Sequence, residues 1–262
     1  MRKRISIWLK ENVIRTIKIG YFADGEWAQR ALQKMLKDTS LKVSFICLRY
    51  GKPDKILLDD AEKYGIPCFI EGNINSEKFM DKIRAYNVDL FVSMSFDQIF
   101  RRKIFDLPPM KTINCHAGKL PYYRGRNILN WALINDEKEF GITVHYVDEG
   151  IDTGDIILQN VYPITDEDTY GTLLDRAYEG CADTLYGAIK MLQEGKAQRI
   201  RQSSIDPVGM YCGSRKKGDE MIEWNQSSRE VFNFVRALNG PDIKAAACLN
   251  GEKMSVEAVR MI

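Results

Sequence analysis

Asn114 and His116 stand two residues apart at the end of an apolar run, and no other spacing in the chain favours chemistry as strongly. Side chains alternate along an extended strand, so both should point to the same side of it. Asp152 follows a second strand-like run, residues 142–147, and adds a carboxylate. An amide, an imidazole and a carboxylate can together orient a carbonyl group, stabilise an oxyanion and move a proton.

The chain has two histidines, and their surroundings differ. Proline and glycine residues follow His116 closely, which indicates a shaped loop at the end of a rigid strand. His145 alternates with Thr143 and Val147 inside a predicted strand. We interpret it as a hydrogen-bonded or surface imidazole rather than as part of a site.

The six cysteines form neither a CxxC pair nor a spacing suited to zinc, so the sequence predicts reduced thiols and no metal site. Cys115 lies between the candidate amide and the candidate imidazole. Its side chain should therefore face the opposite side of the strand, where a core thiol is favoured over a nucleophile.

Length and composition suit either one large globular domain or a domain with a small appendage. A net charge of +2 argues against a general nucleic-acid-binding protein, because such proteins usually carry a basic excess. No apolar run approaches the length of a membrane span, and residues 1–16 lack the apolar core of a secretory signal. We expect a cytoplasmic protein that binds neither nucleic acid nor a membrane.

Strand-like and helix-like segments alternate through most of the chain. Strands are expected at 17–22, 43–48, 68–70, 90–94, 142–147 and 156–161, and helices at 25–36, 57–64, 76–86, 127–135 and 169–193. This alternation predicts an α/β fold with a Rossmann-like, mostly parallel sheet covered on both faces.

The alternation is lost from about residue 204, where short segments surround one helix expected at 228–238. We therefore expect a small C-terminal α+β domain. The predicted division is an N-terminal extension over 1–16, a catalytic domain over 17–203 and the C-terminal domain over 204–262.

Four segments of the chain resemble the 10-formyltetrahydrofolate-dependent formyltransferases. They are NCHAGKLPYYRGRN at 114–127, IDTGDI at 151–156, SMSFDQIF at 93–100 and, more weakly, RALNGP at 236–241. The resemblance is greatest for the sugar-nucleotide N-formyltransferases of bacterial surface-glycan pathways, which serve lipopolysaccharide and O-antigen biosynthesis. It implies the formyltransferase fold and 10-formyltetrahydrofolate as the co-substrate, without a metal.

By this resemblance, Asn114, His116 and Asp152 fall on the catalytic trio of the family. Asn114 would hydrogen-bond the formyl oxygen while a neutral amine attacks the formyl carbon. His116 would stabilise the oxyanion or take the proton of the amine. Asp152 would orient His116 or relay the proton through water, and the sequence leaves open which of the two is the proximal base.

The resemblance implies residues that border the folate, and the chemistry of the acceptor suggests residues that bind it. The folate would be bordered by Ser95, Phe96, Ile99, Glu149 and Gly150, although Phe96 and Ile99 could equally be core packing. The acceptor would be bound by Lys119, Arg124, Arg126, Lys216 and Trp224, because a nucleotide diphosphate needs cations near its pyrophosphate and an aromatic surface for its base. Arg124 could instead pin its own loop to the end of the sheet.

The expected acceptor is a dTDP-linked amino-dideoxyhexose with its amine at carbon 3 or carbon 4. The alternatives are a UDP-amino sugar, methionyl-tRNA and glycinamide ribonucleotide. A folate-dependent deformylating hydrolase and a non-catalytic sugar-nucleotide-binding module are further alternatives. We also expect a homodimer, since members of the family often pair through the C-terminal part.

Overall fold

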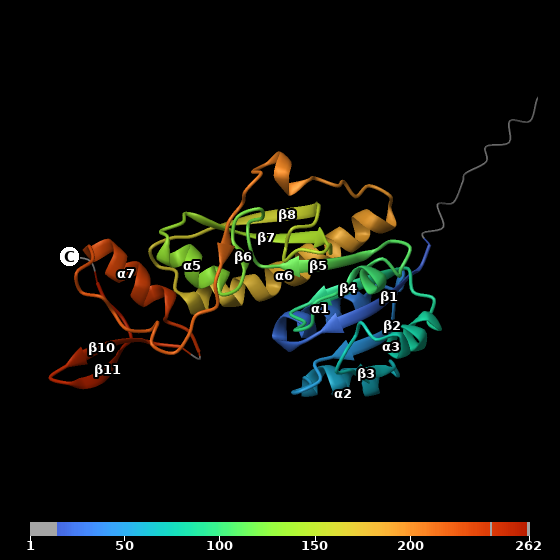
Figure 1. Cartoon of the computed structure of the whole chain (residues 1–262), viewed down its shortest axis with the longest axis horizontal. Coiled ribbons are helices and arrows are strands. Elements are labelled where there is room, and N and C mark those ends of the chain that lie inside the picture. The colour runs from blue at the N-terminus through green and yellow to red at the C-terminus, as the bar shows by residue number, and fades with distance from the viewer. Residues whose placement is uncertain (1–14, 242, 261–262) are drawn as a thin grey trace, which may run out of the picture.

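A seven-stranded sheet forms the centre of the computed structural model, which describes residues 15–241 and 243–260 (Figure 1). The strand order is β3-β2-β1-β4-β5-β7-β8. The strands are β1 Ile17–Ala23, β2 Leu41–Leu48, β3 Cys68–Ile70, β4 Leu90–Met94, β5 Thr112–His116, β7 Glu139–Tyr146 and β8 Ile156–Pro163. The first five strands in this order are parallel, and β7 runs antiparallel to both of its neighbours. The predicted mostly parallel α/β fold is thus confirmed. Most of the predicted N-terminal extension, residues 1–14, lies outside the described residues.

Helices cover both faces of the sheet. Adjacent Tyr21 and Phe22 on β1 are both fully buried, yet they belong to different hydrophobic clusters because successive side chains of a strand point to opposite faces. The Tyr21 face packs against α1 Gly25–Lys37, α2 Lys55–Lys63 and α6 Tyr170–Gln193. The Phe22 face packs against α3 Glu77–Arg84 and α4 Arg102–Phe105.

Two of these helices begin where side-chain caps place them. The Ser76 hydroxyl accepts a hydrogen bond from the Phe79 amide at the start of α3, as expected for an N-cap. Thr169 and Thr172 form a capping box at the start of α6. Helix α6 then runs for 24 residues beneath β5, β7 and β8 (Figure 1).

Helix α6 packs against one face of β5. The Sγ of Cys115 lies 3.7 Å from the carbonyl oxygen of Cys181 on α6, so this thiol packs in the core as predicted. Asn114 and His116 therefore face the opposite side of the sheet. There the chain between α6 and β9 Tyr211–Cys212 crosses back over the strands (Figure 1).

The C-terminal part is built from helix α7 Ser228–Ala237 and the hairpin of β10 Ala245–Leu249 and β11 Glu252–Val256. Ile222, Val235, Leu238 and Ala245 form its buried hydrophobic cluster. Helix α7 packs against α5 Ile128–Ile134, where Asn130 Nδ2 donates a 2.7 Å hydrogen bond to the carbonyl of Ala237. The helix expected at 228–238 is confirmed, while the division of the chain at residue 203 stays a prediction.

Candidate active site

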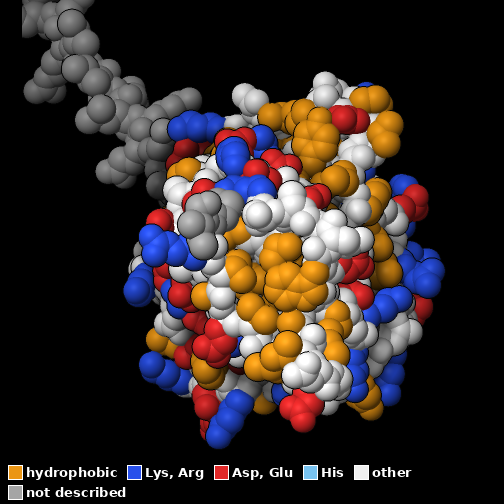
Figure 2. All heavy atoms as spheres, turned by 90° about the vertical axis from the view of Figure 1, so that its left-hand side faces the viewer, with side chains coloured by type: hydrophobic (Ala, Val, Ile, Leu, Met, Phe, Trp, Pro, Cys, Tyr) orange, Lys and Arg blue, Asp and Glu red, His pale blue; other side chains and the backbone are white. Residues whose placement is uncertain are grey.

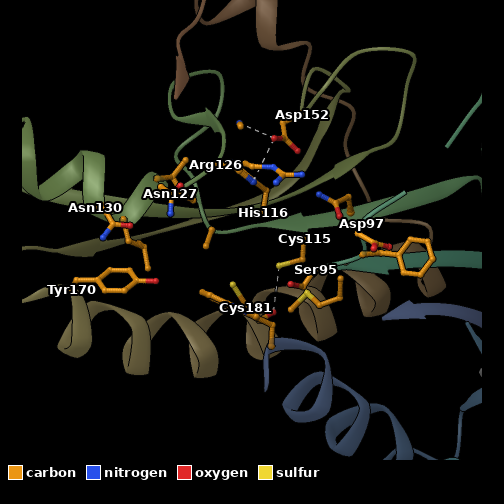
Figure 3. Close-up of a pocket in the computed structure, with 18 of the residues that line it drawn as sticks. Ser95, Asp97, Cys115, His116, Arg126, Asn127, Asn130, Asp152, Tyr170 and Cys181 are labelled. Atoms are coloured by element: carbon orange, nitrogen blue, oxygen red, sulfur yellow. Dashed lines mark hydrogen bonds and ion pairs between the residues drawn. The ribbon is translucent and has the colours of Figure 1, made fainter. Parts of the chain in front are cut away.

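A cavity of about 470 Å³ opens beside the ends of β4 and β5 and the start of α5 (Figure 3). This volume is in the range of pockets that hold small-molecule ligands. Asn114, His116 and Asp152 all line it. The structure thus brings together the three side chains that the sequence predicted would act jointly. Figure 3 shows Asp152 and His116 on the side of β5 opposite to Cys181.

His116 is buried, and one of its ring nitrogens is committed to the backbone. Its Nε2 lies 2.7 Å from the carbonyl oxygen of Tyr123, which only accepts, so Nε2 carries a hydrogen and donates it. Its Nδ1 lies 3.6 Å from Oδ2 of Asp152. In the neutral ring Nδ1 is therefore the nitrogen that can take up a proton.

Asp152 lies between two imidazoles. Its Oδ2 accepts a 3.0 Å hydrogen bond from the backbone N–H of Gly125, and its Oδ1 lies 3.5 Å from Nε2 of His145. Burial opposes ionisation of this carboxyl, but His116, His145 and the Gly125 amide outweigh it and hold the pKa of Asp152 well below its usual range. Asp152 is thus a carboxylate at neutral pH.

His145 is a hydrogen-bonded imidazole, as the sequence predicted, but it is buried rather than on the surface and contacts two members of the site without lining the cavity. The side chain is buried, with Nδ1 2.8 Å from its neighbour's carbonyl at Tyr146 and Nε2 3.3 Å from Nδ2 of Asn114. The antiparallel pairing of β5 with β7 sets Asn114 directly opposite His145. Only the strand order reveals this contact, because the two residues are 31 positions apart.

The amide of Asn114 is oriented by His145. Because the carbonyl of Tyr146 accepts from Nδ1, the neutral imidazole of His145 offers its Nε2 as an acceptor to one hydrogen of the Asn114 amide. An amide nitrogen carries two hydrogens, so the second remains for a ligand oxygen. This arrangement presents one polarising donor at the cavity wall.

Two glycines allow the loops around Asp152 to approach so closely. A Cβ on Gly125, which has a φ of +96°, would lie 2.4 Å from the carbonyl oxygen of Cys212. A Cβ on Gly154 would lie 1.8 Å from the carbonyl oxygen of Tyr146. Neither position tolerates a side chain without a backbone shift. Asp152 itself has a left-handed φ of +55°, so its position depends on the packing around it.

Only part of the predicted folate-binding set lines the cavity. Ser95 and Phe96 do so. Ile99 is 68% exposed and lies outside the lining, which excludes a core role for it. Glu149 forms an ion pair with Arg102 at 2.9 Å, and neither Glu149 nor its neighbour Gly150 lines the cavity.

Arg49 lines the cavity and was not predicted. Its Nη2 donates a 2.6 Å hydrogen bond to the carbonyl of Ser95, and its Nε lies 3.2 Å from Oδ2 of Asp24. Burial raises the pKa of Asp24, and the adjacent Arg49 opposes this shift. Arg49 directly follows the parallel strand β2, at the edge where open sheets bind ligands. This position could have identified it from the sequence.

Of the predicted acceptor-binding residues, Arg126 alone lines the cavity. Its exposed guanidinium makes no ion pair or hydrogen bond within residues 15–241 and 243–260. Lys119 pairs with Glu139, and Trp224 is 62% exposed. Lys119, Lys216 and Trp224 lie outside the lining of this cavity.

Arg124 was expected to bind the acceptor, but its guanidinium is bound within the protein. Its side chain is buried, and Nε and Nη2 both donate to Oε1 of Gln202, at 3.0 and 2.8 Å. Its Nη1 donates to the carbonyl of Val208 at 3.2 Å. These bonds occupy the guanidinium, so Arg124 pins its own loop, which was the alternative interpretation.

Two other kinds of feature are absent from the described residues. These residues contain no group of three or more His, Cys, Asp or Glu side chains arranged to hold a metal ion. They also contain no helix that is both long enough and apolar enough to cross a membrane.

Comparison with known proteins places the chain among formyl transferases. Residues 17–188 match the formyl transferase family, and residues 215–262 match the formyl transferase C-terminal domain. The methionyl-tRNA formyltransferase of Syntrophus aciditrophicus is 36% identical over 198 residues, which are 76% of this chain and 62% of that protein. That of Halothermothrix orenii is 37% identical over 231 residues, or 85% and 72% of the two chains.

Solved structures share the fold. A 4-N formyltransferase from Francisella tularensis superposes with a TM-score of 0.76 at 20% identity, over 94% of this chain and all of that one. A sugar 3N-formyl transferase determined in the presence of dTDP and 5-N-formyl-THF gives a TM-score of 0.68 at 23% identity, over 91% and 85%. The family match, the relatives and the shared fold agree: the chain belongs to the formyl transferase family.

Proposed function

We propose that this protein transfers a formyl group from 10-formyltetrahydrofolate to the amino group of a dTDP-linked amino-dideoxyhexose, for bacterial surface-glycan biosynthesis. The main observation that supports this reaction is that Asn114, His116 and Asp152 line one cavity. An amide donor, an imidazole and an ionised carboxylate can together promote acyl transfer to an amine.

The side chains that line the cavity support a formyl folate as its ligand. The formyl oxygen needs a hydrogen-bond donor, which the second amide hydrogen of Asn114 supplies. The ring system needs a partly apolar wall with backbone groups, which Met94, Ser95 and Phe96 supply. When bound, the folate supplies the electrophilic formyl carbon.

The three side chains have separate tasks in this proposal. Asn114 donates to the formyl oxygen, where negative charge develops as the amine attacks. Nδ1 of His116 takes the proton that the amine loses, because Nε2 is already bound to a carbonyl. Asp152 then faces an imidazolium instead of a neutral ring, and its negative charge stabilises that proton.

Arg126 supports a phosphate-bearing acceptor. A guanidinium without a partner among the described residues, at the wall of the cavity, matches an oxygen-rich anion such as a pyrophosphate. Residues 204–262 carry eight Lys and Arg against eight Asp and Glu, so this part of the sequence offers no basic excess for a nucleic acid. We therefore favour a sugar nucleotide over tRNA.

Methionyl-tRNA is the second candidate acceptor, because the curated relatives described above are methionyl-tRNA formyltransferases. Under this alternative, Asn114, His116 and Asp152 would act in the same way. Arg126 would then contact a phosphate of the tRNA acceptor stem.

We further propose a cytoplasmic homodimer that pairs through the C-terminal part. Figure 2 views this end of the molecule and shows hydrophobic side chains gathered along it, between charged flanks. Trp224, Leu249 and Met254 of the C-terminal part are each at least half exposed. An exposed apolar surface of this kind suits association with a second copy.

The experiment is formyl transfer from 10-formyltetrahydrofolate to a panel of acceptors, with His116→Ala as the inactive control. The panel holds dTDP-3-amino and dTDP-4-amino dideoxyhexoses, a UDP-amino sugar and methionyl-tRNA. Turnover of a dTDP sugar that is lost in the control supports the proposal. Turnover of methionyl-tRNA alone would replace it with the second candidate.

Arg126→Glu tests the acceptor site within the same assay. Charge reversal should raise KM for the sugar nucleotide by about 10- to 100-fold with little change in kcat, since it removes a charge-assisted contact of roughly 1.5–3 kcal/mol. Lys216→Glu is the matched control, because Lys216 lies outside the cavity. Equal effects of the two substitutions would refute a local role for Arg126.

A further inference from the structure

Gln202 is a buried amide in the segment that crosses back over the sheet, just after α6. Its Nε2 donates to the carbonyl oxygens of Asp152 and Gly154, both at 2.8 Å. Its Oε1 accepts from Nε and Nη2 of Arg124. Both hydrogens and the oxygen of this amide are therefore engaged in hydrogen bonds. None of these bonds is made to the side chain of Asn114, His116 or Asp152.

The partners of Gln202 connect it to both ionisable members of the trio. Arg124 stands between Tyr123, whose carbonyl accepts from His116, and Gly125, whose N–H donates to Asp152. One short strand, β6 Arg124–Gly125, and the residue before it thus contact the imidazole and the carboxylate. Gln202 ties this strand to the backbone of the Asp152 loop.

That loop needs an external restraint. Asp152 has a φ of +55°, a conformation that a non-glycine residue keeps only when its surroundings determine it. Two hydrogen bonds from one buried amide, on either side of Thr153, restrain the backbone at this point. A shift of the loop would separate Asp152 from His116 and from Gly125 together.

We propose that Gln202, together with Arg124, is a positioning residue that sets the distance between the carboxylate of Asp152 and the imidazole of His116. The inference rests on the proposed roles of His116 and Asp152 in formyl transfer. It assigns a task in the reaction to two residues outside the trio, one of them 50 positions downstream of Asp152.

Gln202→Glu tests this positioning role. The variant keeps an oxygen acceptor for Arg124 but replaces two donated hydrogens by an oxygen facing carbonyl oxygens, so the Asp152 loop should move. We expect kcat to fall by about 10- to 100-fold, with KM for both substrates within about threefold of wild type, since a misplaced group slows the chemical step more than binding.

Gln159→Glu is the matched control. Gln159 also donates from Nε2, to the carbonyl of Leu120 and the hydroxyl of Thr143, and it does not contact the Asp152 loop. Its variant should keep kcat within about threefold of wild type. Circular dichroism and thermal unfolding establish whether each variant folds. If Gln202→Glu does not fold, Gln202→Asn takes its place, because asparagine withdraws the amide by one methylene.

The pH profile separates positioning from a general loss of structure. The titratable groups that face Asp152 are His116 on β5 and His145 on β7, while Arg124 on β6 faces Gln202. Losing the contacts with His116 and Gly125 lets the pKa of Asp152 rise toward its ordinary value. The acidic limb of the kcat profile should therefore move to higher pH in Gln202→Glu and stay in place in Gln159→Glu.

A nuclear magnetic resonance measurement needs no acceptor. The chain has two histidines, so ¹⁵N spectra of the imidazoles are assigned by comparison with His116→Ala. The His116 signals should shift in Gln202→Glu. Unchanged signals together with unchanged kcat, in a folded variant, would overturn the inference. If the His116 signals shift in Gln202→Glu but the wild-type protein formylates no acceptor, the positioning role would be retained and the proposed function rejected.

Discussion

His145→Phe is the sharpest test of the geometry around Asn114. Phenylalanine keeps a ring of similar size in this buried position but has no nitrogen. The substitution removes the donor to the carbonyl of Tyr146 and the contacts of Nε2 with Asn114 and Asp152. The Asn114 amide is then free to turn, and the carboxylate loses one of its two imidazole neighbours.

The magnitude depends on which contacts bear on the reaction. The contact of Nε2 with Asn114 is one hydrogen bond, which contributes roughly 0.5–1.5 kcal/mol net, so its loss should raise the barrier by about that amount. This corresponds to a fall in kcat of about 2- to 12-fold. The unpaired carbonyl of Tyr146 should separately lower the free energy of unfolding by roughly 1–3 kcal/mol.

The assay is the rate of tetrahydrofolate release at saturating folate and at saturating concentration of the acceptor identified from the panel. Urea unfolding of the same preparation measures the structural cost, so that loss of fold and loss of rate are distinguished. His116→Ala sets the lower limit of activity. A kcat within twofold of wild type in folded His145→Phe would refute the role assigned to His145.

Three further substitutions or treatments have defined outcomes. Asp152→Asn should lower kcat by about 10²- to 10⁴-fold. The pKa of Asp152 is lowered in the folded protein, so its ionised form stabilises the fold above the ordinary aspartate pKa. This contribution is lost as the pH falls. The difference in unfolding free energy between wild type and Asp152→Asn should therefore shrink below about pH 4. Gly154→Ala should cost roughly 1–3 kcal/mol in urea unfolding, since its Cβ would meet the carbonyl of Tyr146, and a neutral result would show that the loop yields easily. Incubation with EDTA should leave formyl transfer unchanged, and a loss reversed by a divalent cation would contradict this expectation.

The sequence was informative where local spacing determines geometry. Alternation along one strand placed Asn114 and His116 on one face and Cys115 on the other, and the structure has this arrangement. Hydrophobic periodicity located α1, α2, α3, α5, α6 and α7 to within two residues, whereas the four-residue helix α4 was not predicted. These features depend on neighbours in the sequence, so the sequence alone could reveal them.

Contacts between residues distant in the sequence were not predicted. His145 was expected to be hydrogen-bonded or at the surface, but its contact with Asn114 exists only because β7 pairs with β5 in antiparallel register, which no local pattern specifies. Arg124 resembled a ligand-binding cation until its acceptor, 78 positions away at Gln202, was seen. Glu149 is likewise held by Arg102, 47 positions earlier. Charged and polar side chains were misjudged because their partners come from the tertiary fold.

The pairing of β6 with β9 has a consequence for exchanging parts between relatives. β6 supplies the Gly125 N–H to Asp152, and its pairing partner is the Tyr211–Cys212 strand, beyond the catalytic sheet in the sequence. Asn127 also accepts from the backbone of Arg215. A chimera that joined this catalytic part to a foreign C-terminal part at residue 203 would remove the partner of β6. A graft that keeps residues up to 215 would preserve the active-site loop and exchange only helix α7 and the C-terminal hairpin.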